Sequence, residues 1–305
     1  MRVLLTGASG YVGSYVLREL LRQNHTPRCL VRGSAADLAV QDDAIEIASG
    51  DVTEPDSLRD AVAGCDAIIH LVGIIEEKRA NGVTFERIHV EGTRHVVEAA
   101  RNAGIDRFIH MSANGARRED ATDYQRTKWD AEQIVKDAGF DHWTIFRPAL
   151  LFGEPDPDRP EFSSRLLKDL VRPFPVLPVF GNGQYELQPV HATEVATAFV
   201  QALTTEAAHG QAYVAAGPDR FSYVEVLDRI ARGAGLAPKP KVHVPLSIAR
   251  LGVYTVGRVG LLPISPAQFE MLVEGNTGDE TAFYRDFDLS PIPYTVENLA
   301  YLETM

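Results

Sequence analysis

The chain begins with MRVLLTGASGYVGSYVLREL, residues 1–20, and this stretch decides the fold. The apolar run at 2–6 is typical of a short buried strand, and the residues after the turn place apolar side chains at helical spacing. Between the two segments, Gly7, Gly10 and Gly13 stand three apart. The stretch therefore predicts a strand, a glycine-rich turn and a helix, in that order.

Each glycine has a role that a side chain would prevent. Gly7 is expected to make the tight turn, Gly10 to let a diphosphate approach the backbone, and Gly13 to let the helix pack against the strand. The unpaired amides at a helix start, together with the helix dipole, favour an anion. The turn therefore predicts a dinucleotide-binding site. The neighbouring residues that we assign to the same site are Ser9, Tyr11 and Val12.

The chain continues as alternating strands and helices up to about residue 150. Strands are expected at 27–32, 45–51, 66–73, 107–113 and 142–153, and helices at 54–64, 86–104 and 123–139. These strands are apolar throughout, and such strands are typical of a parallel sheet that is covered on both faces. We therefore predict an α/β protein with a Rossmann-type, doubly wound parallel sheet.

The regular alternation ends near residue 150. Two proline-rich stretches follow, GEPDPDRP at 153–160 and VRPFPVLPVFGNG at 171–183, and both are typical of loops. We therefore predict two domains. They are a dinucleotide-binding domain at 1–150 and a smaller, irregular mixed α/β substrate domain at 151–305, with 184–203 returning to the first.

The seam between the two domains is where a substrate is expected. Phe152, Phe162 and Tyr185 are candidates for lining a pocket there, although aromatic side chains more often belong to a core. The apolar stretch at 244–263 is expected to be a helix packed on its own domain. The alternative is a surface helix that contacts a membrane or a partner.

Composition and charge exclude several functions. The net charge of −12 argues against a general nucleic-acid binder, which needs clustered cations. No apolar run reaches the ~18 residues of a membrane span, and no secretory signal precedes the first strand. Cys29 and Cys65 are expected to be buried free thiols, which indicates a reducing, cytoplasmic location. The nine histidines form no metal-binding motif, so we predict no metal site.

The residue at the end of the second strand indicates which dinucleotide binds. A carboxylate there accepts a hydrogen bond from the ribose 2′-hydroxyl group and repels a 2′-phosphate, whereas an arginine does the reverse. The segment CLVRGS has Arg32 and Ser34 at this point, with no acid before Asp37. We therefore predict NADP(H) as the preferred cofactor and keep NAD(H) as the alternative.

The segment TDYQRTKWDAE at 122–132 places Tyr124 and Lys128 one helical turn apart, so both side chains point the same way. An ammonium group nearby is expected to lower the pKa of a phenol from about 10. Such a tyrosine can pass a proton to a carbonyl oxygen as a hydride reaches the carbon. The pair therefore predicts Tyr124 as a catalytic acid and base and Lys128 as its electrostatic partner.

The G-x-x-G-x-x-G spacing and the Tyr-x-x-x-Lys pair resemble the extended and atypical short-chain dehydrogenases/reductases. The resemblance implies that Lys128 also hydrogen-bonds the nicotinamide ribose. It assigns GDVTEP at 50–55 to the adenine side and HLVG at 70–73 to the lining of the cofactor site. The further cofactor-binding residues that the resemblance implies are Asp51, Val52, Leu71, Val72, Gly73 and Pro148.

The same family usually has a serine or threonine that binds the substrate carbonyl group. RFIHMSANGA at 107–116 resembles its fifth strand, so Ser112 is the candidate for a third catalytic residue. The next position often carries the catalytic hydroxyl group in extended members, but here it is Ala113. The alternative is that Ser112 is structural and that Asn114 supplies the polar contact, which would argue against ordinary carbonyl reduction.

Segments within 1–235 resemble the atypical branch that contains the 39-kDa, NADPH-binding accessory subunit of respiratory complex I and its free-standing bacterial relatives. In FERIHVEGTRHVVEAARNAGI at 85–105, His89 stands where sugar-modifying members usually have Asn. The branch leaves several options open for partners. They are a respiratory complex, the surface of the inner membrane, and either a monomer or a homodimer formed through 86–102 and 123–138.

Three functions follow from these observations. The first is an NADP(H)-dependent oxidoreductase that acts on a carbonyl, alcohol or quinone-like group of an unidentified apolar small molecule. The second is a non-catalytic structural or sensor protein that NADPH stabilises. The third is a sugar-nucleotide epimerase or dehydratase, against which His89 and Ala113 count.

Overall fold

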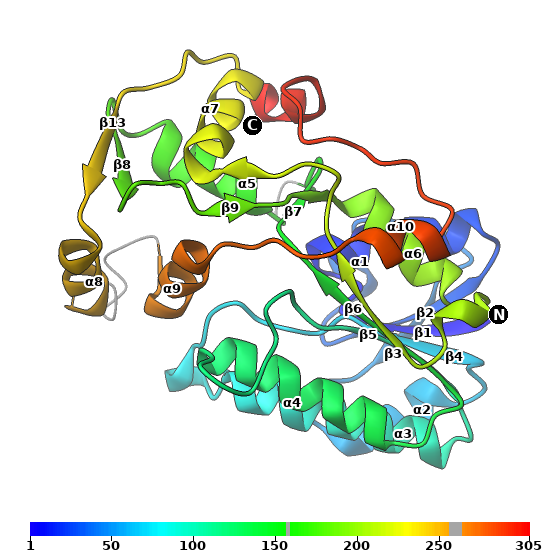
Figure 1. Cartoon of the computed structure of the whole chain (residues 1–305). Coiled ribbons are helices and arrows are strands. Elements are labelled where there is room, and N and C mark those ends of the chain that lie inside the picture. Colours follow the sequence, from blue (N-terminus) through cyan, green and yellow to red (C-terminus); the bar gives the residue numbers. More distant parts are fainter. Residues whose placement is uncertain (157–158, 256–263) are drawn as a thin grey trace. The chain divides into compact units, whose positions relative to one another are not determined.

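The computed structural model describes residues 1–156, 159–255 and 264–305 (Figure 1). The chain divides into two units, each formed by several separate segments. Unit 1 consists of Met1–Pro148, Ala192–Ala215 and Glu280–Ser290, and unit 2 of Ala149–His191, Ala216–Asp279 and Pro291–Met305. The sequence indicated a return of 184–203 to the first domain, whereas the returning segments of the structure are 192–215 and 280–290.

The centre of unit 1 is a seven-stranded sheet in the order β11-β6-β5-β4-β1-β2-β3. All of its neighbouring strands are parallel. The strands are β1 (Arg2–Thr6), β2 (Thr26–Val31), β3 (Glu46–Ser49), β4 (Ala67–His70), β5 (Arg107–Met111), β6 (His142–Pro148) and β11 (Gln211–Ala215). This arrangement confirms the predicted α/β fold with a Rossmann-type, doubly wound sheet.

Helices cover both faces of this sheet. They are α1 (Tyr11–Arg22), α2 (Leu58–Val62), α3 (Gly92–Asn102), α4 (Asp123–Asp137), α6 (Ala192–Gln201) and α10 (Thr281–Asp286). Figure 1 shows α3 and α4 side by side on one face, where Leu4, Ile68 and Phe108 pack in the same core cluster as residues of α2, α3 and α4. Adjacent residues on a strand point to opposite faces, so Ile69 and Ile109 are buried on the other side. Burial on both faces explains why the strands are apolar throughout.

Helix α4 begins at a capping box. The Thr122 hydroxyl group accepts a hydrogen bond from the Gln125 amide, and the Gln125 side chain accepts one from the Thr122 amide. A capping box fixes where a helix starts because it satisfies two amides that have no partner within the helix. The register of the segment that carries Tyr124 and Lys128 is therefore determined locally.

The described residues of unit 2 form three small two-stranded sheets and a core of their own. Its strands are β7 (Leu151–Phe152), β8 (Leu177–Phe180), β9 (Glu186–Leu187), β10 (Val190–His191), β12 (Phe221–Ser222) and β13 (Lys241–Val244). Its α-helices are α5 (Phe162–Leu166), α7 (Tyr223–Gly233), α8 (Leu246–Thr255) and α9 (Pro266–Glu274). Phe152, one of the predicted pocket residues, is instead fully buried in this core with Leu227 and Tyr294. Of the helix predicted at 244–263, the part at 256–263 lies outside the described residues.

Candidate active site and cofactor site

The turn between β1 and α1 requires glycine at two of its three glycine positions. Gly7 has a φ of +80°, which side-chain-bearing residues rarely adopt. A Cβ atom on Gly7 would also lie 3.2 Å from backbone atoms of Leu71 and Val72. A Cβ atom on Gly13 would lie 2.1 Å from the carbonyl oxygen of Gly7. The turn is therefore packed tightly on itself and on the end of β4.

Gly10 is less constrained by the fold than Gly7 and Gly13. It is the N-cap residue of α1, and a Cβ atom there would meet only the Gly7 carbonyl oxygen, at 3.3 Å, among the described atoms. The amides of the first helical turn have no partner within the helix, and Gly10 has no side chain to cover them. This turn therefore fits the diphosphate of a dinucleotide. The adjacent residues predicted for the same site, in order of decreasing exposure, are Ser9, Tyr11 and Val12.

The end of β2 carries both an arginine and an acid. The Arg32 side chain is 77% exposed, and its Nη1 atom lies 3.9 Å from Oδ2 of Asp51. A short 3-10 turn, Ala35–Asp37, brings Asp37 back to this point, where its Oδ2 atom accepts a hydrogen bond from the Ser34 amide at 3.0 Å. A Cβ atom on Gly33 would lie 2.3 Å from the same oxygen. Asp37 was predicted only as the first acid after Arg32, and it is the turn that returns its carboxylate to the strand end.

Asp51 and Val52 form a fixed corner after β3. One Asp51 carboxylate oxygen accepts hydrogen bonds from the amide and the hydroxyl group of Thr53, at 2.8 and 2.9 Å. The Val52 side chain is buried, and a Cβ atom on Gly92 of α3 would lie 3.0 Å from it. The Val52 carbonyl group accepts a hydrogen bond from His95 at 2.9 Å. These contacts hold the corner in place, and the adenine-side role that the family resemblance implies for it stays a prediction.

Lys128 extends from α4 to the ends of β4 and β5. Its Nζ atom donates a hydrogen bond to the carbonyl oxygen of Met111 at 3.0 Å. A Cβ atom on Gly73 would lie 2.8 Å from the same Nζ atom. Burial lowers the pKa of Lys128 to about 8, and the charge of Glu132 opposes that shift. The predicted cofactor segment at Gly73 and the predicted Lys128 therefore lie against each other.

Tyr124 lies one turn before Lys128 and is half-buried. Its ring makes edge-to-face contacts with two other rings. The ring centroids lie 5.6 Å apart for Phe85 and 5.5 Å apart for His89. The prediction that Lys128 lowers the pKa of Tyr124 is wrong for this structure. Burial raises the pKa of Tyr124 to about 12 instead, so the group is a neutral phenol at pH 7 and a proton donor rather than a phenolate.

Ser112 lies just after β5 and is almost fully buried. Its amide donates to the Phe146 carbonyl group at 2.7 Å, but its hydroxyl oxygen has no hydrogen-bond partner among the described residues. The Ser112 hydroxyl group is therefore not bonded to Tyr124 here. Two residues on, the Asn114 amide donates to the Pro148 carbonyl group at 3.0 Å. This bond joins the segment after β5 to Pro148 at the end of β6.

His70, the first residue of the predicted cofactor segment HLVG, and His110, for which no role was predicted, are buried in register on β4 and β5. His70 is hydrogen-bonded to Thr6 at 2.6 Å and to Thr93 at 3.1 Å. The His110 ring stacks on it at 5.5 Å, and neither of the His110 nitrogens has a partner among the described residues. Burial, followed by the charge of Lys128, lowers the pKa of His70 to about 3. The matching Ile-Ile-His and Phe-Ile-His strand ends were the available sequence signal.

His89 connects the loop after β4 with the helix that carries the Tyr–Lys pair. One ring nitrogen is hydrogen-bonded to Thr127 at 2.9 Å, and the other lies 3.1 Å from backbone atoms of Ile74. Burial and the charge of Lys128 lower the pKa of His89 to about 2, so the ring is neutral. A neutral ring at this position adds no second cation beside Lys128.

Other predicted features can be compared with the described residues. Within them, no cluster of three or more His, Cys, Asp or Glu side chains is arranged to hold a metal ion. In the same part of the chain, no helix combines the length and apolar character that crossing a membrane requires. Cys29 and Cys65 are both buried free thiols, and burial raises the pKa of each.

The sequence matches a known family over most of its length. Residues 3–216 match the NAD dependent epimerase/dehydratase family, and the chain belongs to that family. This match confirms the resemblance to the extended short-chain dehydrogenases/reductases, which bind NAD(P).

The individual relatives have different functions. A ceramide reductase of Caulobacter vibrioides is 28% identical over 237 residues, which cover 78% of this chain and 72% of the relative. The mitochondrial NADH-ubiquinone oxidoreductase 40 kDa subunit of Neurospora crassa is 29% identical over 231 residues. That match covers 74% of this chain but only 58% of the relative. The second relative confirms the resemblance to the complex I branch.

Solved structures confirm the fold. MoeE5 in complex with UDP-glucose and NAD has a TM-score of 0.75 and is 19% identical, with 100% of this chain and 98% of the MoeE5 chain covered. At this level of identity, the similarity shows the fold and does not identify a substrate.

Proposed function

We propose that the chain is an NADP(H)-dependent oxidoreductase that interconverts a carbonyl group and an alcohol on an apolar small molecule. The observation that carries the proposal is a convergence at the end of β4. The Gly7 turn packs on Leu71 and Val72, and Lys128 packs on Gly73, the next residue. An anion-binding turn and a Tyr–Lys helix that meet at one strand end are the parts that hydride transfer to a carbonyl group requires.

In the proposed reaction, residues of unit 1 donate the proton and stabilise the charge that remains. A bound dinucleotide would supply the hydride for the carbonyl carbon. The Tyr124 hydroxyl group, neutral at pH 7, donates its proton to the carbonyl oxygen, and the product is an alcohol. The Lys128 ammonium group stabilises the phenolate that remains. In the opposite direction the phenolate takes the proton back.

The preference for NADP(H) over NAD(H) is supported by Arg32, which is exposed at the end of β2 and available to a 2′-phosphate. Asp37 acts against that preference because its carboxylate lies beside Gly33 and Ser34 at the same strand end. We therefore propose that the chain binds both dinucleotides and prefers NADP(H) by a modest factor.

A second candidate function is a non-catalytic, NADPH-binding protein. The Ser112 hydroxyl group is buried and not bonded to Tyr124, and Ala113 offers no hydroxyl group in its place. The similarity to the 40 kDa subunit supports the same view, together with a respiratory complex or the inner-membrane surface as a partner. Under either function the chain is a monomer or a homodimer, for which α3 and α4 are the proposed interface.

Calorimetry with two glycine variants tests cofactor binding. Gly10→Ala adds a methyl group where we place the diphosphate, with one tight contact of 3.3 Å to the Gly7 carbonyl oxygen, so it should weaken NADPH binding at least tenfold and lower the melting temperature far less than Gly13→Ala does. Gly13→Ala should lower the melting temperature because its Cβ atom would overlap the Gly7 carbonyl oxygen. Unchanged NADPH affinity in Gly10→Ala would remove the proposed site.

Turnover separates the two candidate functions. Tyr124→Phe should bind NADPH normally and lose at least a hundredfold in the oxidation of NADPH by a ketone or quinone. If the unmodified chain binds NADPH but oxidises it with no member of a carbonyl and quinone panel, the non-catalytic function is favoured. Equal turnover by Tyr124→Phe would exclude Tyr124 from the reaction.

A further inference from the structure

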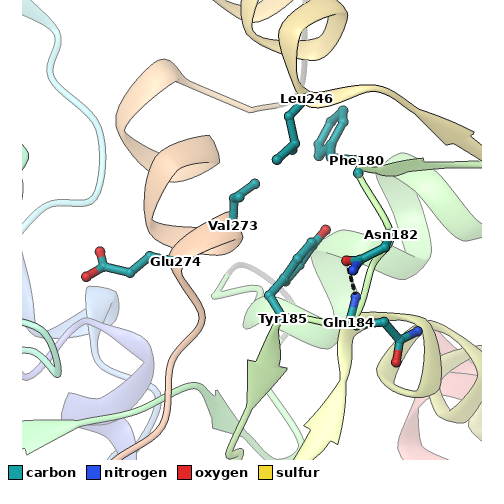
Figure 2. Close-up of a pocket in the computed structure, with 8 residues that line it drawn as sticks. Phe180, Asn182, Gln184, Tyr185, Leu246, Val273 and Glu274 are labelled. Atoms are coloured by element: carbon teal, nitrogen blue, oxygen red, sulfur yellow. Dashed lines mark hydrogen bonds between the residues drawn. The ribbon is translucent and has the colours of Figure 1, made fainter.

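Helix α8 of unit 2 is apolar on two opposite sides, and only its inner side is packed. The inner side carries Ala249 and Val253, which are buried in one cluster with Phe269 of α9. Figure 2 shows Leu246, the first residue of α8, directed towards Val273 of α9, and both belong to the same cluster. This side therefore attaches α8 to its own unit.

The outer side of α8 carries Ile248, Leu251 and Tyr254. These residues are spaced three apart and so form one stripe along the helix. Their exposed fractions are 61%, 68% and 41%. A helix on the surface of a soluble domain normally has charged and polar residues on this side. A stripe of exposed apolar side chains marks a surface that interacts with something else.

Strand β13, which leads into α8, adds to the exposed apolar surface (Figure 1). Leu177 and Val179 of the neighbouring strand β8 are fully buried, so Pro178 between them points to the opposite side. Val242 of β13 is paired with Pro178 and is 56% exposed. Exposed apolar side chains therefore occur on both the strand and the helix.

The charge of this part of the chain differs in sign from that of the whole. The chain has 42 acidic residues and a net charge of −12, but no acid occurs between Asp228 and Glu270. The described basic residues of the same stretch are Arg229, Arg232, Lys239, Lys241 and Arg250. Two of them pair with the acids at its borders, Lys241 with Asp228 at 2.5 Å and Arg250 with Glu270 at 3.0 Å. The stretch is therefore positive overall and is less repelled by an anionic surface than the rest of the chain.

Lys239 forms no ion pair with a described residue. Its Nζ atom donates hydrogen bonds to the carbonyl oxygens of Val171 and Phe174, at 2.5 and 2.8 Å, and neutral acceptors leave its charge uncompensated. The Phe174 side chain is itself exposed. Exposed apolar side chains next to uncompensated cations are the combination that binds the surface of an anionic bilayer.

We infer that α8 and the adjoining strand β13 bind the surface of a membrane that contains anionic phospholipids. The apolar stripe enters the boundary between head groups and acyl chains, and the basic residues are attracted by the lipid phosphate groups. The ten residues of α8 are too few to cross a bilayer, so the helix lies on the membrane. The inference rests on the membrane partner given with the proposed function, and it adds which surface binds and which lipids it selects.

Flotation of the full chain with lipid vesicles tests the inference. The chain should bind vesicles of phosphatidylglycerol and phosphatidylcholine in equal parts, and should bind vesicles of phosphatidylcholine alone at least tenfold more weakly. Leu251→Asp should weaken binding to the anionic vesicles at least tenfold and leave the melting temperature unchanged, because Leu251 is exposed. Met305→Asp is the matched control, since Met305 is an exposed apolar residue of the same unit outside α8 and β13.

Three results of the flotation experiment would overturn the inference. They are a lack of binding to anionic vesicles, equal binding to the two kinds of vesicle, and equal binding by Leu251→Asp and the unmodified chain. A dimer in analytical ultracentrifugation that Leu251→Asp dissociates, in a chain that binds no vesicles, would assign the face to a second copy instead.

Leu251→Trp gives a test by gain of function. Tryptophan prefers the interface between membrane and water, so this variant should bind anionic vesicles severalfold more tightly. Its fluorescence should also shift to shorter wavelength when the vesicles are added. The unmodified chain supplies the background, because Trp129 and Trp143 both belong to unit 1. An emission that does not shift would contradict the inference.

NADPH titrations keep this inference apart from the proposed function. Leu251→Asp should bind NADPH as the unmodified chain does, because the cofactor residues all belong to unit 1. Vesicle binding without NADPH binding would reject the proposed function alone. NADPH binding without vesicle binding would reject this inference alone.

Discussion

Glu132 in unit 1 and Glu161 in unit 2 are both buried carboxylates, but different partners hold them. Glu132 forms two hydrogen bonds with Arg147, at 2.7 and 2.6 Å, and an ion pair with Lys136 at 3.3 Å. Glu161 accepts hydrogen bonds from the amides of Ser163 and Ser164 and from the Tyr301 hydroxyl group, and it forms no ion pair with a described residue.

The consequence is that cations compensate the charge of Glu132, whereas the charge of Glu161 is not compensated. Burial raises the pKa of Glu161 to about 7, although its hydrogen bonds act against the shift. The charge of Glu132 acts on the candidate active site, because it raises the pKa of Lys128 and so opposes the effect of burial. Backbone donors are sufficient to cap a short helix, whereas a paired carboxylate also sets the charge of its neighbours.

The largest expected effect is the loss of the ion pair in unit 1. Glu132→Ala leaves Arg147 without its carboxylate, and the free energy of unfolding should fall by about 3 kcal/mol. The two tryptophans of the chain, Trp129 and Trp143, both lie in unit 1, so fluorescence during urea unfolding reports on this unit. Asp123→Ala is the control, because its pair with Arg126 is exposed and should contribute less than about 1 kcal/mol. Equal losses in the two variants would contradict the comparison.

The second effect concerns the uncompensated carboxylate of unit 2. Its pKa is about 7 in the folded chain and near the ordinary value when unfolded, so the folded state holds a proton that the unfolded chain releases. Stability should therefore fall as pH rises from about 4.5 to about 7, by an amount on the order of 1–3 kcal/mol. Glu161→Gln should lose this pH dependence. Unfolding followed by circular dichroism at pH 5 and pH 8 measures it, and identical pH dependence in both proteins would reject the explanation.

The third expected effect is a pH dependence of NADPH affinity that follows the protonation of the buried Lys128. Since the pKa of Lys128 is about 8, the ammonium group loses its proton as pH rises through that value. NADPH affinity should fall by up to about tenfold between pH 7 and pH 9, because a cation next to an anionic cofactor is lost. Lys128→Met should show no such step in a calorimetric pH series. Arg126→Gln, an exposed cation on the same helix, should keep it, and a step retained by Lys128→Met would assign the titration to another group.

The smallest expected effect is a change in the ratio of NADPH to NADH affinity when the surface carboxylate of Asp37 is removed. Asp37 is exposed, so its repulsion of a 2′-phosphate is screened by solvent. Asp37→Asn should raise the ratio of NADPH to NADH affinity severalfold, and Arg32→Ala should lower it. Asp43→Asn removes an exposed acid further along the chain and should leave the ratio unchanged. If Asp37→Asn leaves the ratio unchanged as well, the end of β2 does not set the preference.

Local patterns were enough to predict the sheet, the glycine turn and the Tyr–Lys helix. Apolar strands, helical spacing and glycine positions are written in neighbouring residues, and the family match and the fold confirm the interpretation. The return of 280–290 to unit 1 could not be predicted, because it depends on contacts with β11 that are distant in sequence.

The chemistry of the site was less predictable for the same reason. The pKa of Tyr124 is raised by burial, a tertiary property that the Tyr–Lys spacing does not predict. Asp37 reaches the strand end only through a turn, and the buried Ser112 hydroxyl group is seen to lack a partner among the described residues only once its surroundings are known. Residue types and spacing predict which groups are available, and packing determines their charge.

Hydrogen–deuterium exchange with and without NADPH tests the central claim most directly, because it locates the bound dinucleotide. The account predicts slower exchange in peptides that cover Gly7–Gly13 and Leu71–Gly73, the two segments that meet at the end of β4. Binding of NADPH that leaves the exchange of both segments unchanged and protects another part of the chain would contradict it.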